Sequence, residues 1–232
     1  MNWNEFPDRN KLVDGVCRRI HDQLADSLVN RPEAGIALAG GATPLPIYAG
    51  LAGMALDWSR VTAVATDERW VPLDHEASNA RQIGRQFAGS GLRVASLVPA
   101  HAPGRANVDQ AEQTLAGMPQ PFDLVVVGMG SDAHFASLFP QSPALSAGLD
   151  PGTKAGALVV VPDPLPPEAP FARVSLTLSR LLATRCLLLV ISGQAKRDVL
   201  EQAAQPGVDA HQLPIAALLR TAGENLEIFW SP

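Results

Sequence analysis

An aspartate and a histidine stand two residues apart just after the apolar run FDLVVV, within the segment GMGSDAHFASLFP at residues 128–140. Gly128 and Gly130 indicate a turn at the end of a buried strand, and Asp132 and His134 follow that turn. A histidine can take up and return a proton near neutral pH, and a nearby carboxylate can orient the ring. Asp132 and His134 are therefore candidate catalytic residues. The alternative is a structural turn in which Asp132 caps a short helix over FASLFP.

A second candidate site is the segment AGGATP, which follows the short apolar run GIALA. Two glycines let the backbone approach a ligand closely, and a following helix, capped by Thr43 with Pro44 in its first turn, offers free N–H groups. The segment matches neither the nucleotide P-loop pattern nor GxGxxG, so a nucleotide or dinucleotide site is disfavoured. An ordinary tight turn is the alternative to an anion site. The candidate phosphate- or carboxylate-binding residues are Gly40, Gly41, Ala42 and Thr43.

Charged side chains follow other apolar runs. Asp67 and Arg69 lie in TDERWVP, directly after the run VTAVA, although solvated loop charges would give the same pattern. Arg173 opens the extended run RVSLTL, and Lys196 lies in the first turn of a helix after VISG. The helix dipole disfavours a cation at a helix N-terminus, so Lys196 indicates a nearby anion unless it is simply exposed. All of these segments are expected at the carboxyl ends of strands, where open parallel sheets bind their ligands.

Composition disfavours several functions. The net charge is −5 and no basic patch is present, so neither a nucleic-acid nor a membrane partner is expected. Cys17 and Cys186 form no CxxC pattern, and no third ligand stands near Asp132 and His134, which argues against a metal site. The GxSxG pattern of serine hydrolases is absent, so attack by water is favoured over an acyl-enzyme. No signal peptide is recognisable, and a cytoplasmic location is expected.

Helices and strands that must position these residues alternate along the chain. Helices are expected at residues 9–30, from 44 onward, 78–87, 107–118, from 177 onward, 194–204 and 214–220, with caps at Ser78 and Asn107. Strands are expected at residues 35–40, 61–66, 92–99, 122–130, 157–163, 173–176, 186–193 and 226–230. The alternation predicts an α/β fold with a doubly wound, mostly parallel sheet and helices on both faces, a Rossmann-like three-layer sandwich. Residues 1–232 are expected to form one domain, with the proline-rich residues 161–170 as a surface loop near the site.

Four segments together resemble a known family. AGGATP, TDERWVP with SNA after it, GMGSDAHFASLFP, and RVSLTL followed by SGQAK occur in this order and resemble the glucosamine-6-phosphate isomerase/6-phosphogluconolactonase superfamily. The length and the DERWVP segment with its following SN are similar to the lactonase branch. The resemblance implies hydrolysis of 6-phospho-D-glucono-1,5-lactone to 6-phospho-D-gluconate in the pentose phosphate pathway, without a metal or organic cofactor. The substrate is thus a small phosphorylated sugar lactone, and a monomer or a homodimer is expected.

The resemblance also implies roles for individual residues. His134, with Asp132, would activate the water that attacks C1 of the lactone and would then return the proton to the leaving ring oxygen. Asp67 and Arg69 match the segment that lines the family's sugar pocket. The implied phosphate site consists of Gly40, Gly41, Ala42, Thr43, Arg173 and Lys196.

Three positions depart from the family's pattern, and two other functions are open. Ala133 stands where the family usually has glycine, and it is strained if that position needs a positive φ. Phe135 replaces the usual threonine, which removes a hydroxyl from the edge of the expected pocket, and Ala42 replaces a serine of the phosphate loop. An isomerase or deaminase of amino-sugar phosphates would use Asp67 as the enolising base and His134 as the ring-opening acid. A non-catalytic sugar-phosphate sensor is the third possibility.

Overall fold

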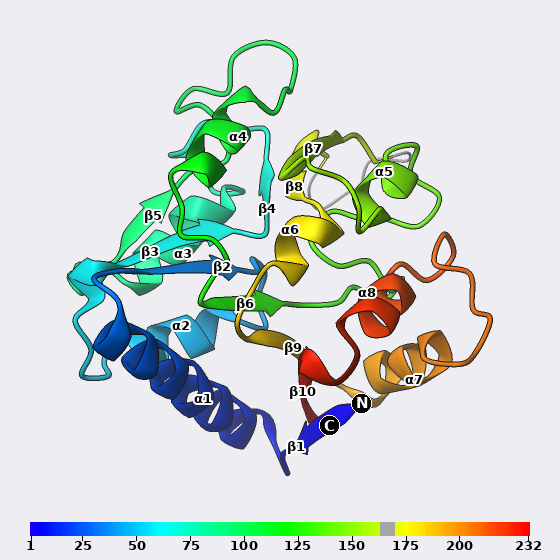
Figure 1. The fold of residues 1–232 in the computed structure, drawn as a ribbon, viewed down its shortest axis with the longest axis horizontal. Helices are drawn as coiled ribbons and strands as arrows, with labels where there is room; N and C mark the ends of the chain where they lie inside the picture. Colours follow the sequence, from blue (N-terminus) through cyan, green and yellow to red (C-terminus); the bar gives the residue numbers. More distant parts are fainter. Residues whose placement is uncertain (163–169) are drawn as a thin grey trace.

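Two β-sheets form the frame of the molecule (Figure 1). The computed structural model describes residues 1–162 and 170–232, so most of the proline-rich segment expected to be a surface loop lies outside the described residues. The larger sheet has seven strands in the order β1-β10-β9-β6-β2-β3-β5, and every neighbouring pair is parallel. Its strands are β1 (Asn2–Glu5), β2 (Ala34–Leu38), β3 (Val61–Ala65), β5 (Arg93–Ala95), β6 (Leu124–Val127), β9 (Leu187–Ser192) and β10 (Leu226–Ser231).

Helices cover both faces of the larger sheet and close an apolar core on each. One core lies under α1 (Arg9–Asn30), α2 (Leu45–Ala52) and α3 (Asn79–Gln86), and the other under α4 (Asp109–Ala116), α5 (Leu145–Leu149), α6 (Leu178–Leu182), α7 (Gln194–Ala203) and α8 (Ile215–Ala222). In β6, Leu124 and Val126 face the first core, whereas Val125 and Val127 face the second. Because both faces are covered, such strands are apolar throughout. The expected doubly wound α/β fold is confirmed. Among the described residues, no helix combines the length and the apolar character needed to cross a bilayer.

The smaller sheet is antiparallel and begins at the carboxyl edge of the larger one. Its order is β4-β8-β7, with β4 (Asp67–Arg69), β7 (Ala157–Val160) and β8 (Arg173–Leu176). Only Thr66 separates β3 from β4. The strands expected at 157–163 and 173–176 thus form a second sheet. The strands β1 and β4 were not expected, because their sequences, NWNE and DER, lack an apolar alternation and depend on pairing with neighbouring strands.

Helix starts agree only in part with the expected caps. The Ser78 side chain accepts a hydrogen bond from a backbone N–H at the start of α3, as expected, and Thr177, for which no cap was expected, does the same at the start of α6. Asn107 lies one residue before the N-cap position of α4, but its side chain accepts from the Asp109 N–H at 3.1 Å. Thr43 does not cap α2, because Pro44 occupies the N-cap position. The Thr43 hydroxyl is thereby left for another use.

The short helix expected over FASLFP is absent, and the segment turns instead. Phe135 and Leu138 form an isolated antiparallel bridge across the turn. Ala133 and Ala136 have positive φ angles of 66° and 49°. A right-handed helix requires negative φ at every residue, so two such alanines exclude it.

The buried carboxylate of Glu68 joins β4 to the start of α3. One oxygen accepts hydrogen bonds from the backbone N–H groups of Arg69 and Asn79 at 2.8 and 2.7 Å. The other accepts from the Ala80 N–H at 2.7 Å and from the Ser78 hydroxyl at 3.1 Å. Burial raises the pKa of Glu68, although the backbone donors oppose this rise. This side chain fixes the position of the segment that carries Asp67.

We expect Glu68→Gln to lower the free energy of unfolding by about 2–4 kcal/mol, because an amide cannot accept from four donors and leaves buried N–H groups unpaired. Urea denaturation followed by circular dichroism measures the change. Glu76→Gln is the matched control, since Glu76 is an exposed residue between β4 and α3. Equal stability of the two variants would contradict this role for Glu68.

Candidate active site

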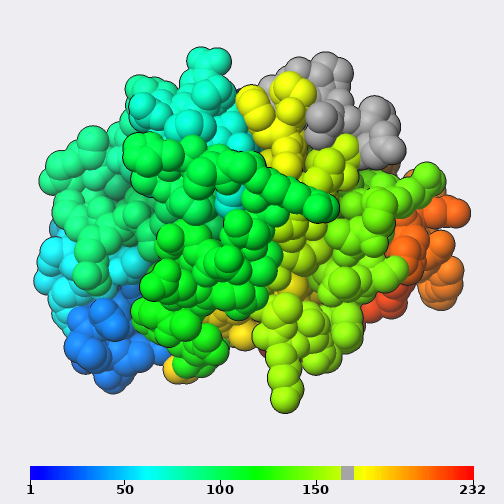
Figure 2. All heavy atoms as spheres, turned by 90° about the horizontal axis from the view of Figure 1, so that it is seen from above, coloured from blue at the N-terminus to red at the C-terminus, as the bar shows by residue number. Residues whose placement is uncertain are grey.

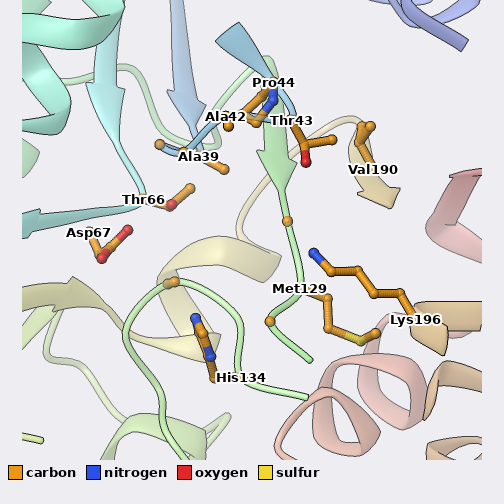
Figure 3. A pocket seen from close by; sticks show the side chains of 15 residues that line it. Ala39, Ala42, Thr43, Pro44, Thr66, Asp67, Met129, His134, Val190 and Lys196 are labelled. Atoms are coloured by element: carbon orange, nitrogen blue, oxygen red, sulfur yellow. The ribbon is translucent and has the colours of Figure 1, made fainter. Parts of the chain in front are cut away.

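Loops that follow four parallel strands, β2, β3, β6 and β9, line one pocket at the carboxyl edge of the larger sheet (Figure 3). Parallel strands all end at the same edge, so segments far apart in sequence meet there. The pocket has a volume of about 200 Å³. Its lining consists of Ala39, Gly40, Gly41, Ala42, Thr43, Pro44, Thr66, Asp67, Gly128, Met129, Gly130, His134, Ala136, Val190 and Lys196.

Most of the residues expected at the site meet in this pocket. Among the described residues, Asp132, Arg69 and Arg173 are expected site residues that do not line it. Asp132 contacts His134 from behind, and the two arginines belong to the smaller sheet. The expected residues that line the pocket are Gly40, Gly41, Ala42, Thr43, Asp67, His134 and Lys196.

Asp132 holds the ring of His134. The distance between Asp132 Oδ1 and His134 Nδ1 is 2.5 Å, and the same oxygen lies 3.3 Å from the His134 backbone nitrogen. Burial raises the pKa of Asp132, but its hydrogen bond with His134 and the charge of that ring outweigh burial and lower the pKa overall. The ionised carboxylate selects the tautomer with its proton on Nδ1, which leaves Nε2 as an acceptor. His134 side-chain exposure is 28%, and Figure 3 shows the ring directed into the pocket.

The loop that carries this pair is tightly constrained. A side chain at Gly130 would overlap both the His134 ring and the Asp132 carboxylate. The Gly130 N–H donates to the His134 carbonyl at 2.9 Å. Ala133 has the positive φ at which glycine is favoured, so its departure from the family's pattern carries the expected strain. Phe135 is fully buried in the core and does not line the pocket, so the expectation that it borders the pocket is wrong.

The loop of residues 40–43, the candidate anion cradle, lines the same pocket as His134. Gly41 has a φ of 94°, and the backbone N–H groups from Gly41 to Thr43 donate to no other part of the described chain. Arg9 donates to the Ala42 carbonyl at 3.0 Å and so ties the loop to α1. The Lys196 ammonium points into the pocket toward this loop (Figure 3). Burial lowers the pKa of Lys196, and the charge of Asp132 partly opposes this.

Buried polar groups fix Asp67 in the pocket wall. The Ser137 hydroxyl donates to Asp67 Oδ2 at 2.5 Å, and the Asn79 amide donates to the Asp67 carbonyl at 2.7 Å. Asn79 stands in the SNA motif, but the sequence indicated no role for it. Ser137, Thr66 and Met129 were also not expected at the site. For Ser137, the only signal in the sequence is its position three residues after His134. Its partner Asp67 is 70 residues away.

Arg69 and Arg173 lie side by side in the smaller sheet, outside the pocket lining. Arg69 donates to the Ala77 carbonyl at 2.7 Å. The Arg173 guanidinium lies 5.0 Å from the centre of the Phe139 ring, and that ring lies 4.4 Å from the His134 ring. Both arginines therefore lie outside the pocket lining, and Arg173 contacts Phe139 of the loop that carries His134.

The described residues contain no group of three or more His, Cys, Asp or Glu side chains arranged to hold a metal ion.

A parallel α/β sheet with an acid–base pair and an anion cradle at its carboxyl edge defines an α/β enzyme for small anionic substrates. The chain belongs to the family of glucosamine-6-phosphate isomerases/6-phosphogluconolactonase, whose model matches residues 7–230. The resemblance drawn from the four sequence motifs is thereby confirmed.

Individual relatives point to the lactonase branch. The chain is 34% identical to a 6-phosphogluconolactonase of Mesorhizobium japonicum, over 100% of this chain and 95% of the relative. It is 34% identical to one of Caulobacter vibrioides, over 97% and 95% of the two chains. A crystal structure of a 6-phosphogluconolactonase from Shewanella baltica superposes with a TM-score of 0.90 at 32% identity, covering 100% of this chain and 98% of that one. These comparisons confirm the expected kind of enzyme.

We expect Gly40→Ala to destabilise the protein by about 1–3 kcal/mol, because the added methyl group overlaps the Asn79 side-chain amide. Displacement of Asn79 also releases Asp67, so affinity for ligands of the pocket falls as well. Gly128→Ala is the matched control, since a methyl group there meets nothing within 4 Å. Thermal unfolding of both variants tests the difference, and equal melting temperatures would show that the contact has no effect.

Proposed function

We propose that this chain hydrolyses 6-phospho-D-glucono-1,5-lactone to 6-phospho-D-gluconate, a step of the pentose phosphate pathway. One observation carries the proposal: His134, held by Asp132 at 2.5 Å, shares a pocket with an anion cradle and Lys196. Residues 1–232 would act as one domain in the cytoplasm, and the reaction needs no cofactor. The names of the relatives support the choice of substrate.

In the proposed mechanism, His134 Nε2 takes a proton from a water molecule as the water oxygen bonds to C1 of the lactone. The carbonyl oxygen becomes an oxyanion. When it collapses, the bond between C1 and the ring oxygen breaks, and the imidazolium returns its proton to that oxygen. The ionised Asp132 keeps Nδ1–H in place and stabilises the charged ring between the two steps. The carboxylic acid product then loses its proton to solvent.

The phosphate of the substrate would lie between the cradle of residues 40–43 and the Lys196 ammonium. Backbone N–H groups and a lysine suit a phosphate dianion, and the positive end of α7 adds to the field. These contacts are remote from C1, so they orient the lactone and supply binding energy rather than chemistry. Thr43 would contribute its hydroxyl to the phosphate, because this hydroxyl does not cap α2.

Asp67 would accept hydrogen bonds from the sugar hydroxyls, since its carboxylate lies in the pocket wall. We propose that Arg69 and Arg173 favour the anionic substrate through their positive charge from outside the pocket lining, with Arg173 beside Phe139. The rival deaminase chemistry would use Asp67 as a base. Ser137 donates a short hydrogen bond to Asp67 Oδ2, so this side chain is held in place in the pocket wall under either chemistry.

We expect His134→Ala to lower kcat by about 10²–10⁴-fold, because the general base is lost. Lactone made from glucose-6-phosphate with a dehydrogenase is the substrate, and acid release above the spontaneous rate is the readout. His211→Ala is the matched control: His211 closes a second Asp-Ala-His sequence, and its Nδ1 lies 3.3 Å from Asp209, but it is exposed and lies outside the pocket.

Full activity of His134→Ala would remove His134 from the mechanism. Release of ammonia from glucosamine-6-phosphate, with no acceleration of lactone hydrolysis, would move the chain to the deaminase branch. Binding of the phosphorylated sugar without either turnover would support a sensor.

We expect Lys196→Ala to weaken the binding of 6-phosphogluconate by about 10- to 100-fold, because one charged donor to the phosphate is lost. Isothermal titration calorimetry measures the dissociation constant. Lys11→Ala is the control, since Lys11 is an exposed residue of α1. An unchanged dissociation constant for Lys196→Ala would place the phosphate elsewhere.

Affinity should also depend on pH through Lys196. Its pKa is lowered, so the ammonium loses its proton at a lower pH than an ordinary lysine, and binding weakens earlier as the pH rises. Lys196→Arg should keep its affinity to higher pH, because a guanidinium stays charged. Parallel pH profiles of the two proteins would contradict this assignment.

A further inference from the structure

Arg180 in α6 is a buried cation without a polar partner. Only 6% of its surface is exposed. Its three guanidinium nitrogens are all buried, and none makes a hydrogen bond within the described part of the chain. Its guanidinium stacks on the ring of Phe122, whose centre lies 3.7 Å from the guanidinium carbon.

Such a side chain is costly to the folded state. Stacking on an aromatic ring recovers only part of what a buried charge loses when it leaves water. Burial lowers the pKa of Arg180 to about 10, with the charge of Glu112 opposing this, so the group is still protonated at neutral pH. No ion pair joins Glu112 to Arg180 among the described residues, and Glu112 Oε1 accepts from the Gly156 and Ala157 N–H groups, both at 2.9 Å.

Arg180 lines a cavity of about 360 Å³ between α4, residues 153–156 and α6. Lys154, Thr153 and Ser179 supply further polar side chains to its wall. The cavity shares no lining residue with the active-site pocket. A cavity with two cations and two hydroxyls suits an anion, and Glu112 is the carboxylate that faces it, with its charge partly offset by the two N–H groups.

We propose that this cavity binds a small phosphate- or carboxylate-bearing anion, with Arg180 as its principal ligand and the exposed Lys154 at its mouth. The guanidinium fork matches two oxygens of either group. In the structure the guanidinium stacks on the Phe122 ring and its nitrogens are buried, so anion binding requires the Arg180 side chain to rotate about its outer bonds toward the cavity. Binding there relieves the unpaired charge and joins α4, residues 153–156 and α6.

The test is a calorimetric titration with inorganic phosphate on the Lys196→Ala protein, in which the active-site cradle is weakened. Phosphate should still bind, and the additional change Arg180→Met should weaken that binding at least about 10-fold. Arg105→Met on the same background is the matched control, because it removes the charge of an exposed arginine outside the cavity. Lys154→Ala should weaken binding only a few fold. Citrate in place of phosphate reports whether carboxylates are accepted.

Thermal unfolding shows whether Arg180→Met folds. Methionine can pack on Phe122 without a charge, so the variant should melt no lower than its parent in phosphate-free buffer. Phosphate should raise the melting temperature of the Lys196→Ala protein and leave that of the double variant unchanged. No phosphate binding in Lys196→Ala, or equal binding after Arg180→Met, would overturn the proposal. Neither result depends on lactone turnover, so failure of the lactonase assay leaves this test intact.

Discussion

The parallel direction of all seven strands in the larger sheet is the constraint on which the site depends. Each strand ends at the same edge, so the loops after β2, β3, β6 and β9 are brought to one place. Gly41, Asp67, His134 and Lys196, widely separated in sequence, therefore share one pocket. The two apolar cores on either face of the sheet hold the strand ends in place. The strands themselves are largely apolar, so the polar residues of the pocket lie beyond their ends, at this edge.

The negative charge of Asp132 acts on both His134 and Lys196. Its carboxylate lies 2.5 Å from His134 Nδ1, and its charge also supports the protonated state of Lys196 against burial. The loop that places it includes Ala133 in a left-handed conformation, at a cost of roughly 1–2 kcal/mol. Ala133 is buried, and its carbonyl accepts a hydrogen bond from Ile215 N–H at 3.0 Å, which anchors the strained loop to α8. The fold thus maintains a conformation that the residue itself disfavours.

The smaller sheet supports the pocket from outside. β4 continues from β3 and carries Asp67 into the wall, while the Glu68 carboxylate fixes β4 against α3. Arg173 extends this support through Phe139 to the His134 ring. The three charged residues of the TDERWVP segment therefore differ in position. Asp67 faces the pocket, the Glu68 carboxylate binds the backbone at the start of α3, and Arg69 lies outside the pocket lining.

The sequence by itself determined the doubly wound fold and most of the site. The helix α1 follows from the helical spacing of its apolar residues, and the strand β6 from an unbroken apolar run; both patterns are local properties of the sequence. The glycine loops and the Asp-Ala-His segment at residues 132–134 were recognisable because each directly follows an apolar strand, where open parallel sheets bind ligands. Family resemblance then added the substrate class.

Only the tertiary structure decided the rest, because those features depend on partners distant in the chain. The strands β1 and β4 have no apolar pattern and exist through pairing with β10 and β8. Residues from other elements determine the hydrogen bond from Ser137 to Asp67 and the turn that replaces a helix after His134. Packing likewise places Arg69 and Arg173 outside the pocket lining. The sequence indicated no role for Arg180. Its unpaired charge arises only where α6 packs beside Phe122.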